Sequence, residues 1–304
     1  MSIDTLTGTV TRLQSGFYQV RLEDNSNVVC RLRGRLKKGR VTGDLVAVGD
    51  EVILEMQPDG TGAIAEVLPR RSALVRLDPT PRGVYRQVML ANAHQVVLTF
   101  ACTQPEPRLR MLDRFLVICE KQNLPMLIVA NKVDLLGLER AQQIFSIYPP
   151  LGYPVLYTSA QSGLGVAELS EYLTGKLSAL AGPSGVGKSS LLNAVQPELG
   201  LAVREISQFN SRGRHTTVVR EMFALNQGGY VVDLPGLRSL ALWDTEPEEL
   251  DGYFPELREL VELCQFNDCT HRTEPGCAVR AAVTAGTVHP ERYESYLRMR
   301  YGGE

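Results

Sequence analysis

Hydrophobic and polar residues alternate in short runs over residues 4–68. The alternation is clearest in four segments: Thr9–Thr11, Tyr18–Leu22, Val28–Leu32 and Glu51–Leu54. Residues that favour turns separate these segments, namely Gly16, Asp24, Asn25, Gly49, Asp50, Asp59 and Gly60. A period of two predicts strands with one buried face, and about five short strands in this length suit a small closed barrel such as an OB-fold.

From His94 onward, short apolar segments alternate with stretches of helical spacing. The predicted strands are Gln95–Ala101, Met126–Ala130, Pro154–Tyr157, Ser178–Ala181, Val218–Leu225 and Tyr230–Asp233. Between them, apolar residues recur at helical spacing: Leu112, Phe115, Leu116 and Cys119, then Val166, Leu169 and Leu173. Nearly continuous apolar strands that alternate with helices predict a mostly parallel, doubly wound α/β sheet.

The remaining segments follow neither pattern. Residues 69–92 are rich in Pro and Arg, and we interpret 71–92 as a linker. Beyond Trp243, Glu246–Glu262 is predicted to be an acidic amphipathic helix, followed by a cysteine cluster and a helical stretch from His289. The chain is therefore predicted to be multidomain. We expect residues 1–70 to form a β-barrel, residues 93–243 to form an α/β domain and residues 244–304 to form a mostly helical domain.

Composition narrows the class of protein. The chain has 304 residues, which exceeds the length at which one hydrophobic core stops growing, so several domains are expected. The 32 Lys and Arg residues against 34 Asp and Glu residues give a net charge of −2, so any nucleic-acid contact must use a segregated basic patch. The sequence has no apolar run of membrane-spanning length and no signal peptide, and we expect a cytoplasmic protein without a membrane partner.

A phosphate-binding loop lies between a predicted strand and a predicted helix. Residues 182–189 match the pattern G-x-x-x-x-G-K-[ST] in the strand–loop–helix context that this pattern requires. Backbone N–H groups and Lys188 are expected to hold the phosphates of a nucleotide, and the Ser189 hydroxyl is expected to hold Mg²⁺. The predicted nucleotide contacts are Gly182, Pro183, Ser184, Gly185, Val186, Gly187, Lys188, Ser189 and Ser190.

The identity of the base is predicted from four residues that follow the apolar strand ending at Ala130: Asn131, Lys132, Val133 and Asp134. The Asp134 carboxylate can accept two parallel hydrogen bonds from guanine N1–H and its 2-amino group, a donor pair that adenine lacks. Asn131 would tie the loops together, and the Lys132 stem would cover the base. Ser159 and Ala160 end the next strand, where backbone N–H groups can meet guanine O6. Taken alone, the Asn131 segment is also compatible with a capped turn.

Two later segments complete a triphosphate site. Asp233 ends a strand and would reach Mg²⁺ through water, and the Gly236 N–H would contact the γ-phosphate. Of two adjacent threonines, Thr217 is favoured as a further Mg²⁺ ligand and Thr216 is the alternative. Leu237 cannot hydrogen-bond an attacking water, so we expect slow intrinsic hydrolysis and a partner that completes the site.

The order of these motifs differs from the common arrangement of GTPases, in which the phosphate loop comes first. Here the base-recognition segments at 131 and 158 precede the phosphate loop at 182, and Asp233 comes last. Circular permutation preserves a fold when the original termini lie close together, because packing depends on strand positions. We therefore predict a circularly permuted GTPase domain whose last switch runs directly into the C-terminal region.

Half of the six cysteines lie within fourteen residues near the C-terminus. Together with one histidine they offer four nitrogen and sulfur ligands: Cys264, Cys269, His271 and Cys277. This set fits one closed tetrahedral Zn²⁺ site with a structural role. The alternative is reduced cysteines in a small core, which polar neighbours such as Asn267 and Asp268 oppose. Cys30, Cys102 and Cys119 lie in apolar patterns and are interpreted as small buried hydrophobic residues.

A basic segment follows the predicted strand Val28–Leu32. Its six cationic residues, without an intervening acid, are Arg31, Arg33, Arg35, Lys37, Lys38 and Arg40. Small barrels bind single-stranded or looped RNA through such surfaces, so these residues are candidate RNA contacts. The alternative is a solvated loop.

Over essentially its whole length, the sequence resembles the RsgA (YjeQ) family of circularly permuted GTPases that depend on the small ribosomal subunit. The resemblance is carried by the permuted Asn131–Asp134, phosphate-loop and Asp233–Gly236 motifs and by the cysteine cluster. It implies an OB-fold, a permuted GTPase domain and a C-terminal zinc domain. It also implies that His215 positions the attacking water.

The function expected from the motifs and the resemblance is hydrolysis of GTP to GDP and phosphate, stimulated by the small (30S) ribosomal subunit during its late maturation. The expected partners are that subunit and its rRNA, and the protein is expected to be a monomer. The expected cofactors are Mg²⁺ with GTP and one structural Zn²⁺. Two alternatives stay open: an RNA-binding scaffold with a structural guanine nucleotide, and an ATP-driven enzyme, which Asp134 disfavours.

Overall fold

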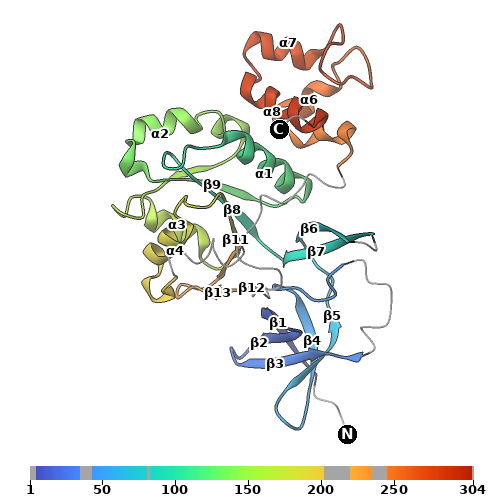
Figure 1. The fold of residues 1–304 in the computed structure, drawn as a ribbon, viewed down its shortest axis with the longest axis vertical. Helices are drawn as coiled ribbons and strands as arrows, with labels where there is room; N and C mark the ends of the chain where they lie inside the picture. The colour runs from blue at the N-terminus through green and yellow to red at the C-terminus, as the bar shows by residue number, and fades with distance from the viewer. Residues whose placement is uncertain (1–4, 35–42, 81–82, 202–219, 235–244, 303–304) are drawn as a thin grey trace.

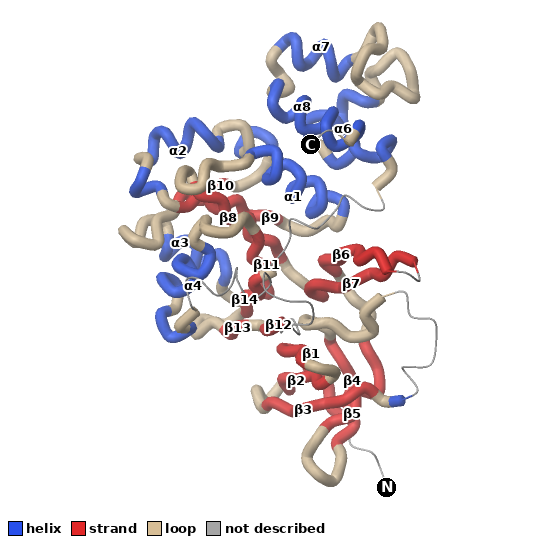
Figure 2. The backbone as a smooth tube through the Cα atoms, in the orientation of Figure 1, coloured by secondary structure: helices blue, strands red, loops and turns tan. Residues whose placement is uncertain are grey.

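The computed structural model describes residues 5–34, 43–80, 83–201, 220–234 and 245–302 (Figure 1). For 76–80, 83, 84 and 220 it describes the backbone alone. Figure 2 shows a strand-rich part that begins near the N-terminus, a sheet flanked by helices in the middle, and a helical part that holds the C-terminus. A five-strand barrel, a mixed α/β sheet and a helical region with a Cys₃His cluster confirm the predicted fold class.

The N-terminal barrel has five strands that close on themselves. They are β1 (Thr5–Gln14), β2 (Phe17–Leu22), β3 (Asn27–Leu32), β4 (Glu51–Met56) and β5 (Gly62–Val67). β1 pairs with both β2 and β4, β3 pairs with β2 and β5, and β4 pairs with β5. In β3, Val28 and Cys30 are buried in the barrel core, whereas Val29 and Arg31 between and beyond them are exposed. The alternation that predicted the strands therefore separates an apolar interior from a polar exterior.

Residues interpreted as a linker instead form an antiparallel hairpin of β6 (Ala73–Thr80) and β7 (Gly83–Ala91). Leu74, Val88 and Leu90 are buried, so the segment has an apolar side that its many arginines and prolines obscure in the sequence. The hairpin is also joined to the loop before β4, because the Tyr85 hydroxyl and the Val88 N–H donate to the Asp44 carboxylate at 2.9 and 3.0 Å. The segment interpreted as a linker therefore contains regular secondary structure, which the sequence pattern did not predict.

The central sheet has the strand order β10-β9-β8-β11-β14-β13. Its strands are β8 (Gln95–Ala101), β9 (Met126–Asn131), β10 (Val155–Tyr157), β11 (Leu177–Ala181), β13 (Phe223–Ala224) and β14 (Tyr230–Asp233). All neighbours are parallel except β13, which is antiparallel to β14. The mostly parallel sheet is confirmed, and its carboxyl ends meet along one edge.

Helices cover both faces of this sheet. They are α1 (Leu109–Lys121), α2 (Leu138–Phe145), α3 (Val166–Leu173) and α4 (Lys188–Val195). Successive residues of β8 alternate between two cores: Leu98 packs with Phe115 of α1 and Phe145 of α2, whereas Val97 packs with Leu169 of α3. Burial on both faces explains why these strands read as continuous apolar runs.

The predicted strand Val218–Leu225 is described from residue 220, and it contributes to two sheets. β12 (Arg220–Glu221) pairs antiparallel with β1 of the barrel, and β13 pairs with β14 of the central sheet. Met222 between them is buried, and its N–H donates to the Thr11 carbonyl at 2.8 Å. The apolar pattern predicts extended backbone here, but it carries no information about which sheet each half joins.

The C-terminal region consists of η6 (Pro247–Tyr253), α6 (Pro255–Val261), α7 (Ala278–Ala285) and α8 (Pro290–Tyr301). The single helix predicted over Glu246–Glu262 is wrong, because the extended Phe254 separates η6 from α6 and Pro255 can only begin a helix. In the described part of the chain, no helix combines the length and the apolar character needed to cross a bilayer.

Candidate nucleotide site and metal centre

The phosphate loop runs from the end of β11 to the start of α4 and depends on two glycines. A Cβ on Gly182 (φ +145°) would lie 2.0 Å from the Thr99 carbonyl oxygen of β8. A Cβ on Gly187 (φ +94°) would lie 2.5 Å from the Asn131 side-chain nitrogen. Because only glycine fits these two close approaches, the loop packs directly against β8 and the base-recognition segment. Lys188 then begins α4, and its ammonium group donates to the carbonyls of Gly182 and Pro183 at 3.0 and 3.1 Å.

Asp233 ends β14 beside the phosphate loop, since β14 pairs with β11 through Asp233 and Leu180. Both carboxylate oxygens are buried and have no hydrogen-bond partner among the residues that the structure describes. Burial raises the pKa of Asp233 to about 6, although the positive charge of Lys188 lowers it. A buried carboxylate with two unpartnered oxygens next to a phosphate loop is suited to a hydrated divalent cation.

The base-recognition segment is fastened to the phosphate loop at two points. The Asn131 amide, which is buried, donates to the Val186 carbonyl at 2.8 Å and accepts from the Thr158 hydroxyl at 3.1 Å. Lys132 adopts a left-handed conformation (φ +65°), and its ammonium group donates to the Gly185 carbonyl at 2.7 Å. The structure therefore brings together segments that are about fifty residues apart in the sequence, as the permuted motifs predicted.

Asp134 lies at the exposed rim of this site. Its carboxylate accepts a hydrogen bond from the Ser159 hydroxyl at 2.6 Å, and the Ser162 N–H donates to the same hydroxyl oxygen at 3.1 Å. Parallel pairing of β9 with β10 places the two strand ends side by side. Asp134 is thereby oriented by a side chain from the neighbouring strand end, which suits recognition of a paired donor edge.

Some contacts of this site were not predicted from the sequence. The Lys132 ammonium also donates to the Gln104 carbonyl, in the loop that follows β8. No residue type in that loop indicates this role, because the acceptor is a backbone carbonyl. Several predicted residues lie outside the described part of the chain, namely His215, Thr216, Thr217, Gly236 and Leu237.

The cysteine cluster forms a compact set of ligand atoms. The sulfur atoms of Cys264, Cys269 and Cys277 and a ring nitrogen of His271 all lie within 4.8 Å of one another. His271 is fully buried, and its Nδ1 lies 3.5 Å from Cys264 Sγ and 3.4 Å from Cys277 Sγ. Three thiols and an imidazole around one point fit a tetrahedral metal ion, and Nδ1 is the nitrogen that faces it.

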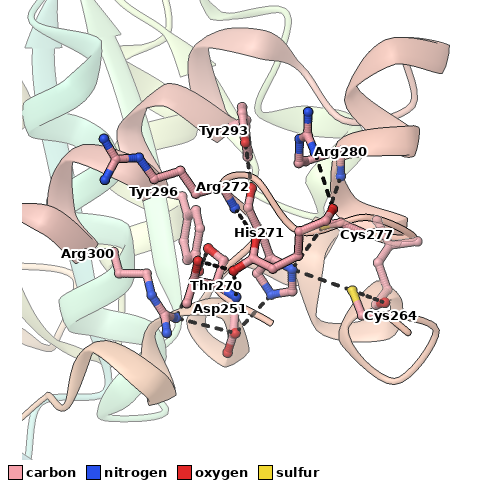
Figure 3. A network of polar contacts seen from close by, with 12 residues as sticks. Asp251, Cys264, Thr270, His271, Arg272, Cys277, Arg280, Tyr293, Tyr296 and Arg300 are labelled. Carbon is pink, nitrogen blue, oxygen red and sulfur yellow. Dashed lines mark hydrogen bonds and ion pairs between the residues drawn. The ribbon is translucent and has the colours of Figure 1, made fainter. Parts of the chain in front are cut away.

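The other face of the His271 ring is held by the protein, as Figure 3 shows. His271 Nε2 lies 3.2 Å from the Asp251 carboxylate, and the Tyr293 hydroxyl donates to the His271 carbonyl at 2.6 Å. A carboxylate at Nε2 fixes the proton there and leaves Nδ1 free to bind a metal. Sequence reasoning missed Asp251, which is twenty residues from His271 and outside the cluster.

The cysteines outside the cluster have a different environment. Cys30, Cys102 and Cys119 are buried in the barrel core or the α/β core, and burial raises their pKa to about 11, 11 and 12. These thiols are protonated and unreactive near neutral pH. The interpretation of the three as small hydrophobic residues is confirmed by their burial.

Two of the six candidate RNA contacts lie in the described part of the chain. Arg31 is exposed at the end of β3, whereas Arg33 is ion-paired with Glu55 of β4. The other four, Arg35, Lys37, Lys38 and Arg40, lie outside the described residues.

Comparison with known proteins gives one consistent result. Residues 67–243 match the RsgA GTPase family, and residues 7–64 match the RsgA N-terminal domain. The chain is 44% identical over 296 residues to "Small ribosomal subunit biogenesis GTPase RsgA" of Gemmatimonas aurantiaca, covering 97% of this chain and 96% of that protein. It is 41% identical over 298 residues to the protein of the same name from Thermotoga petrophila, and the match covers 97% of this chain and 95% of that protein.

Two solved structures share the whole architecture. YjeQ from Thermotoga maritima has a TM-score of 0.80 and 37% identity, with 99% of this chain and 100% of that chain covered. YloQ, described as a circularly permuted GTPase, has a TM-score of 0.74 and 32% identity, with 98% and 95% covered.

Proposed function

The chain belongs to the RsgA family of small ribosomal subunit biogenesis GTPases, and from this premise we propose that it hydrolyses GTP on the small subunit during late maturation. The observation that supports the nucleotide most strongly is the junction of Asn131 and Lys132 with the phosphate loop at Val186 and Gly185. That junction builds one nucleotide site from motifs in permuted order.

Guanine recognition is proposed to depend on Asp134. Its carboxylate would accept from N1–H and the 2-amino group, while the Ser159 hydroxyl keeps it oriented. The backbone N–H groups of Ser159 and Ala160 would approach O6, and the aliphatic stem of Lys132 would cover one face of the base. Adenine offers no matching donor pair, so an adenine nucleotide would leave the carboxylate unpaired.

The phosphates are proposed to bind in the loop from Gly182 to Ser190, with Lys188 moving from its carbonyl partners onto the phosphate oxygens. The Asp233 carboxylate, which has no hydrogen-bond partner among the described residues, and the buried Ser189 fit a magnesium site. Thr217 is the proposed third ligand and Thr216 is the alternative. When bound, Mg²⁺ neutralises charge that develops on the phosphates. The Gly236 N–H would contact the γ-phosphate.

For hydrolysis, we propose that His215 orients the attacking water. Leu237, the residue after Gly236, has no polar atom with which to do so. An imidazole with an ordinary pKa near 6.5 can polarise water at neutral pH. Because the side chain next to Gly236 does not contribute, a bound partner that completes the site around the attacking water would raise the turnover rate.

The Cys₃His cluster is proposed to hold one structural Zn²⁺ through Cys264, Cys269, His271 and Cys277. Four protein ligands leave no open coordination position for a substrate or water, so the metal stabilises the C-terminal region and takes no part in hydrolysis. Asp251 keeps the ring of His271 oriented toward the metal.

The proposed partners are GTP or GDP and the small ribosomal subunit with its rRNA, and the protein is proposed to act as a cytoplasmic monomer. The barrel with its basic segment after β3, and the zinc region, would make the RNA contacts. The proposed functional division is residues 1–70 for RNA binding, 93–243 for GTP hydrolysis and 244–304 for the zinc region, with the β6–β7 hairpin between the first two.

The direct test is multiple-turnover phosphate release from GTP with and without purified small subunits, repeated at raised salt. The proposal expects subunits to raise kcat and added salt to weaken the stimulation, because contacts with phosphate groups release counterions. His215→Ala should retain GTP affinity and lose the stimulated rate. Equal turnover with and without subunits would instead support a scaffold in which the nucleotide is structural.

A further inference from the structure

The outer face of β2 and β3 carries exposed apolar side chains. Phe17 is 43% exposed and Val29 is 52% exposed. In the antiparallel register Tyr18 lies opposite Cys30 and Gln19 opposite Val29, so Phe17 is next to Arg31 across the strand pair. Tyr18 and Cys30 point into the barrel core, and their outward neighbours therefore share one face. Figure 1 shows β3 on the side of the barrel away from the central sheet.

Phe17 and Arg31 already form a cation–π contact. The Arg31 guanidinium carbon lies 4.5 Å from the centroid of the Phe17 ring. This cation–π contact brings two flat groups together on an exposed surface. Unpaired nucleic-acid bases stack on aromatic rings and on guanidinium planes, so both groups are of the type that binds them.

The charge of the sequence that follows β3 favours a polyanion. After Arg31 the chain carries five further basic residues before its next acid, Asp44. Arg33 is engaged by Glu55 within the barrel. Arg31 also lies near enough to Asp59 to contribute to lowering its pKa, after the hydrogen bonds from Thr61. Arg31 itself is exposed on the same face as Phe17.

We propose that Phe17 and Arg31 form a stacking platform for an unpaired RNA base, with the positive charge of Arg31 also holding the adjoining phosphate. In barrels of this type the face of strands 2 and 3 is a common position for oligonucleotides. The proposal rests on the proposed function, because it identifies Phe17 as the residue that adds base stacking to the RNA contacts of the barrel.

The platform is tested by fluorescence anisotropy with a labelled, unstructured oligouridine and the full chain. Phe17→Leu keeps an apolar side chain but removes the ring, and it should weaken binding by about 5-fold or more, since stacking on an aromatic ring contributes at least ~1 kcal/mol per base. Phe17→Trp should bind at least as tightly as the wild type. Leu6→Ala on β1, which removes an apolar side chain that is 37% exposed, is the matched control and should leave the affinity unchanged.

Salt titration separates stacking from charge. The slope of log affinity against log salt should be the same in Phe17→Leu as in the wild type, and it should fall by about 0.7 in Arg31→Gln, the value for one phosphate contact on a single strand. Thermal melting of each variant shows that the barrel is folded. Equal oligouridine affinity in the wild type, Phe17→Leu and Phe17→Trp would overturn the platform, as would no oligouridine binding by the wild type.

Two further outcomes are distinguishable. If Phe17→Leu weakens binding to the small subunit but not to oligouridine, the face contacts a ribosomal protein and the proposal is wrong. If Phe17→Leu weakens oligouridine binding while small subunits fail to raise GTP turnover by the wild type, the platform stands and the proposed function is wrong.

Discussion

At the scale of single residues, the burial of the Asp233 carboxylate beside the phosphate loop is energetically unfavourable. Its two carboxylate oxygens are buried without a partner among the described residues, and its pKa is raised to about 6 by that burial. An isolated buried carboxylate destabilises the folded chain, and such residues persist where a ligand requires them. The energetic cost is thus located where the proposed magnesium ion would offset it.

This burial has a pH dependence whose sign follows from the raised pKa. The folded chain binds the Asp233 proton more tightly than the unfolded chain, so ionisation lowers the free energy of unfolding as the pH rises from about 4 through about 6. Relative to the wild type, Asp233→Asn should gain about 1 kcal/mol in the free energy of unfolding between about pH 5 and about pH 7.

The measurement is urea unfolding of the nucleotide-free protein at both pH values. The difference in the free energy of unfolding between the variant and the wild type is measured at each pH, and the two differences are compared. Any cost of burying the asparagine amide is the same at both pH values and therefore cancels. The same variant should lose Mg²⁺-dependent GTP binding. A stability difference that does not vary with pH would show that Asp233 is ionised at low cost.

Asp251 is the residue that should tune the metal centre. Its carboxylate lies 3.2 Å from His271 Nε2, and Asp251→Ala should lower zinc affinity by about 10- to 100-fold, the usual effect of removing such a partner. The amide oxygen of Asp251→Asn can still accept a hydrogen bond from His271 Nε2–H. The zinc affinity of this variant should therefore lie between those of the wild type and Asp251→Ala. Asp268→Ala is the control, because Asp268 is an exposed acid in the same cluster loop.

Competition with a chromogenic chelator measures these zinc affinities directly. Equal affinities for Asp251→Ala and Asp268→Ala would mean that the carboxylate does not orient the ring.

At the scale of elements, the sequence predicted the strands of the sheet and the motifs at their ends for a physical reason. Strands such as β8, buried on both faces, must be apolar throughout, and loops at their carboxyl ends must hold the polar residues. The apolar pattern does not predict strands whose formation or pairing depends on tertiary contacts. The β6–β7 hairpin is held by hydrogen bonds to Asp44 and by a few buried residues, and β12 pairs with β1 of the barrel.

Local patterns could not predict pairs that are distant in sequence. Asp251 and His271, or Phe17 and Arg31, become neighbours only once the fold is complete. By contrast, Asn131 was assigned correctly to the junction between loops, because its motif implies the loop it must reach.

Helix α8 is fastened to α1 by a buried ion network. Arg292 is 1% exposed, donates to Asp113 of α1 at 2.7 Å and donates to Glu256 of α6 at 2.7 Å. The Ser295 hydroxyl donates to the same Asp113. This network, together with Val117 in the C-terminal core, positions the zinc region on the GTPase sheet.

Removing the central cation leaves two buried carboxylates unpaired. Arg292→Ala should therefore lower the free energy of unfolding by about 3–5 kcal/mol and expose the C-terminal region to proteolysis. Arg298→Ala, in the half-exposed Arg298–Glu294 pair of the same helix, is the matched control and should cost about 0.5 kcal/mol or less. Urea unfolding and limited proteolysis measure both effects. Equal losses in the two variants would show that the network does not carry the attachment.

At the scale of the whole molecule, three parts meet at two joints. The barrel is joined to the central sheet through β1 and β12, where Arg12 lies opposite Glu221, and the C-terminal region is joined through Arg292. Asn131, Lys188 and Asp233 lie at or shortly after the carboxyl ends of β9, β11 and β14.

The metal centre and the nucleotide site should nevertheless be separable. The C-terminal core that contains Cys269 and Cys277 is distinct from the two cores of the sheet. Chelation of zinc should unfold the segment after about residue 250, while GTP affinity changes by no more than about 2-fold, because metal binding and local folding are coupled. Circular dichroism and GTP titration before and after chelation test this. Loss of GTP binding in the same step would show that the regions fold as one unit.

The central claim is that Asp134 and the phosphate loop, though permuted in the chain, form one guanine site. The most direct measurement is calorimetric binding of GTP and xanthosine triphosphate to the wild type and to Asp134→Asn. Xanthine has a carbonyl oxygen in place of the 2-amino group, so it needs an amide donor where guanine needs a carboxylate acceptor. The wild type should prefer GTP and the variant xanthosine triphosphate, each by about 10- to 100-fold, as expected when a charged acceptor or a donor is left unpaired. An unchanged preference for GTP in the variant would contradict the account.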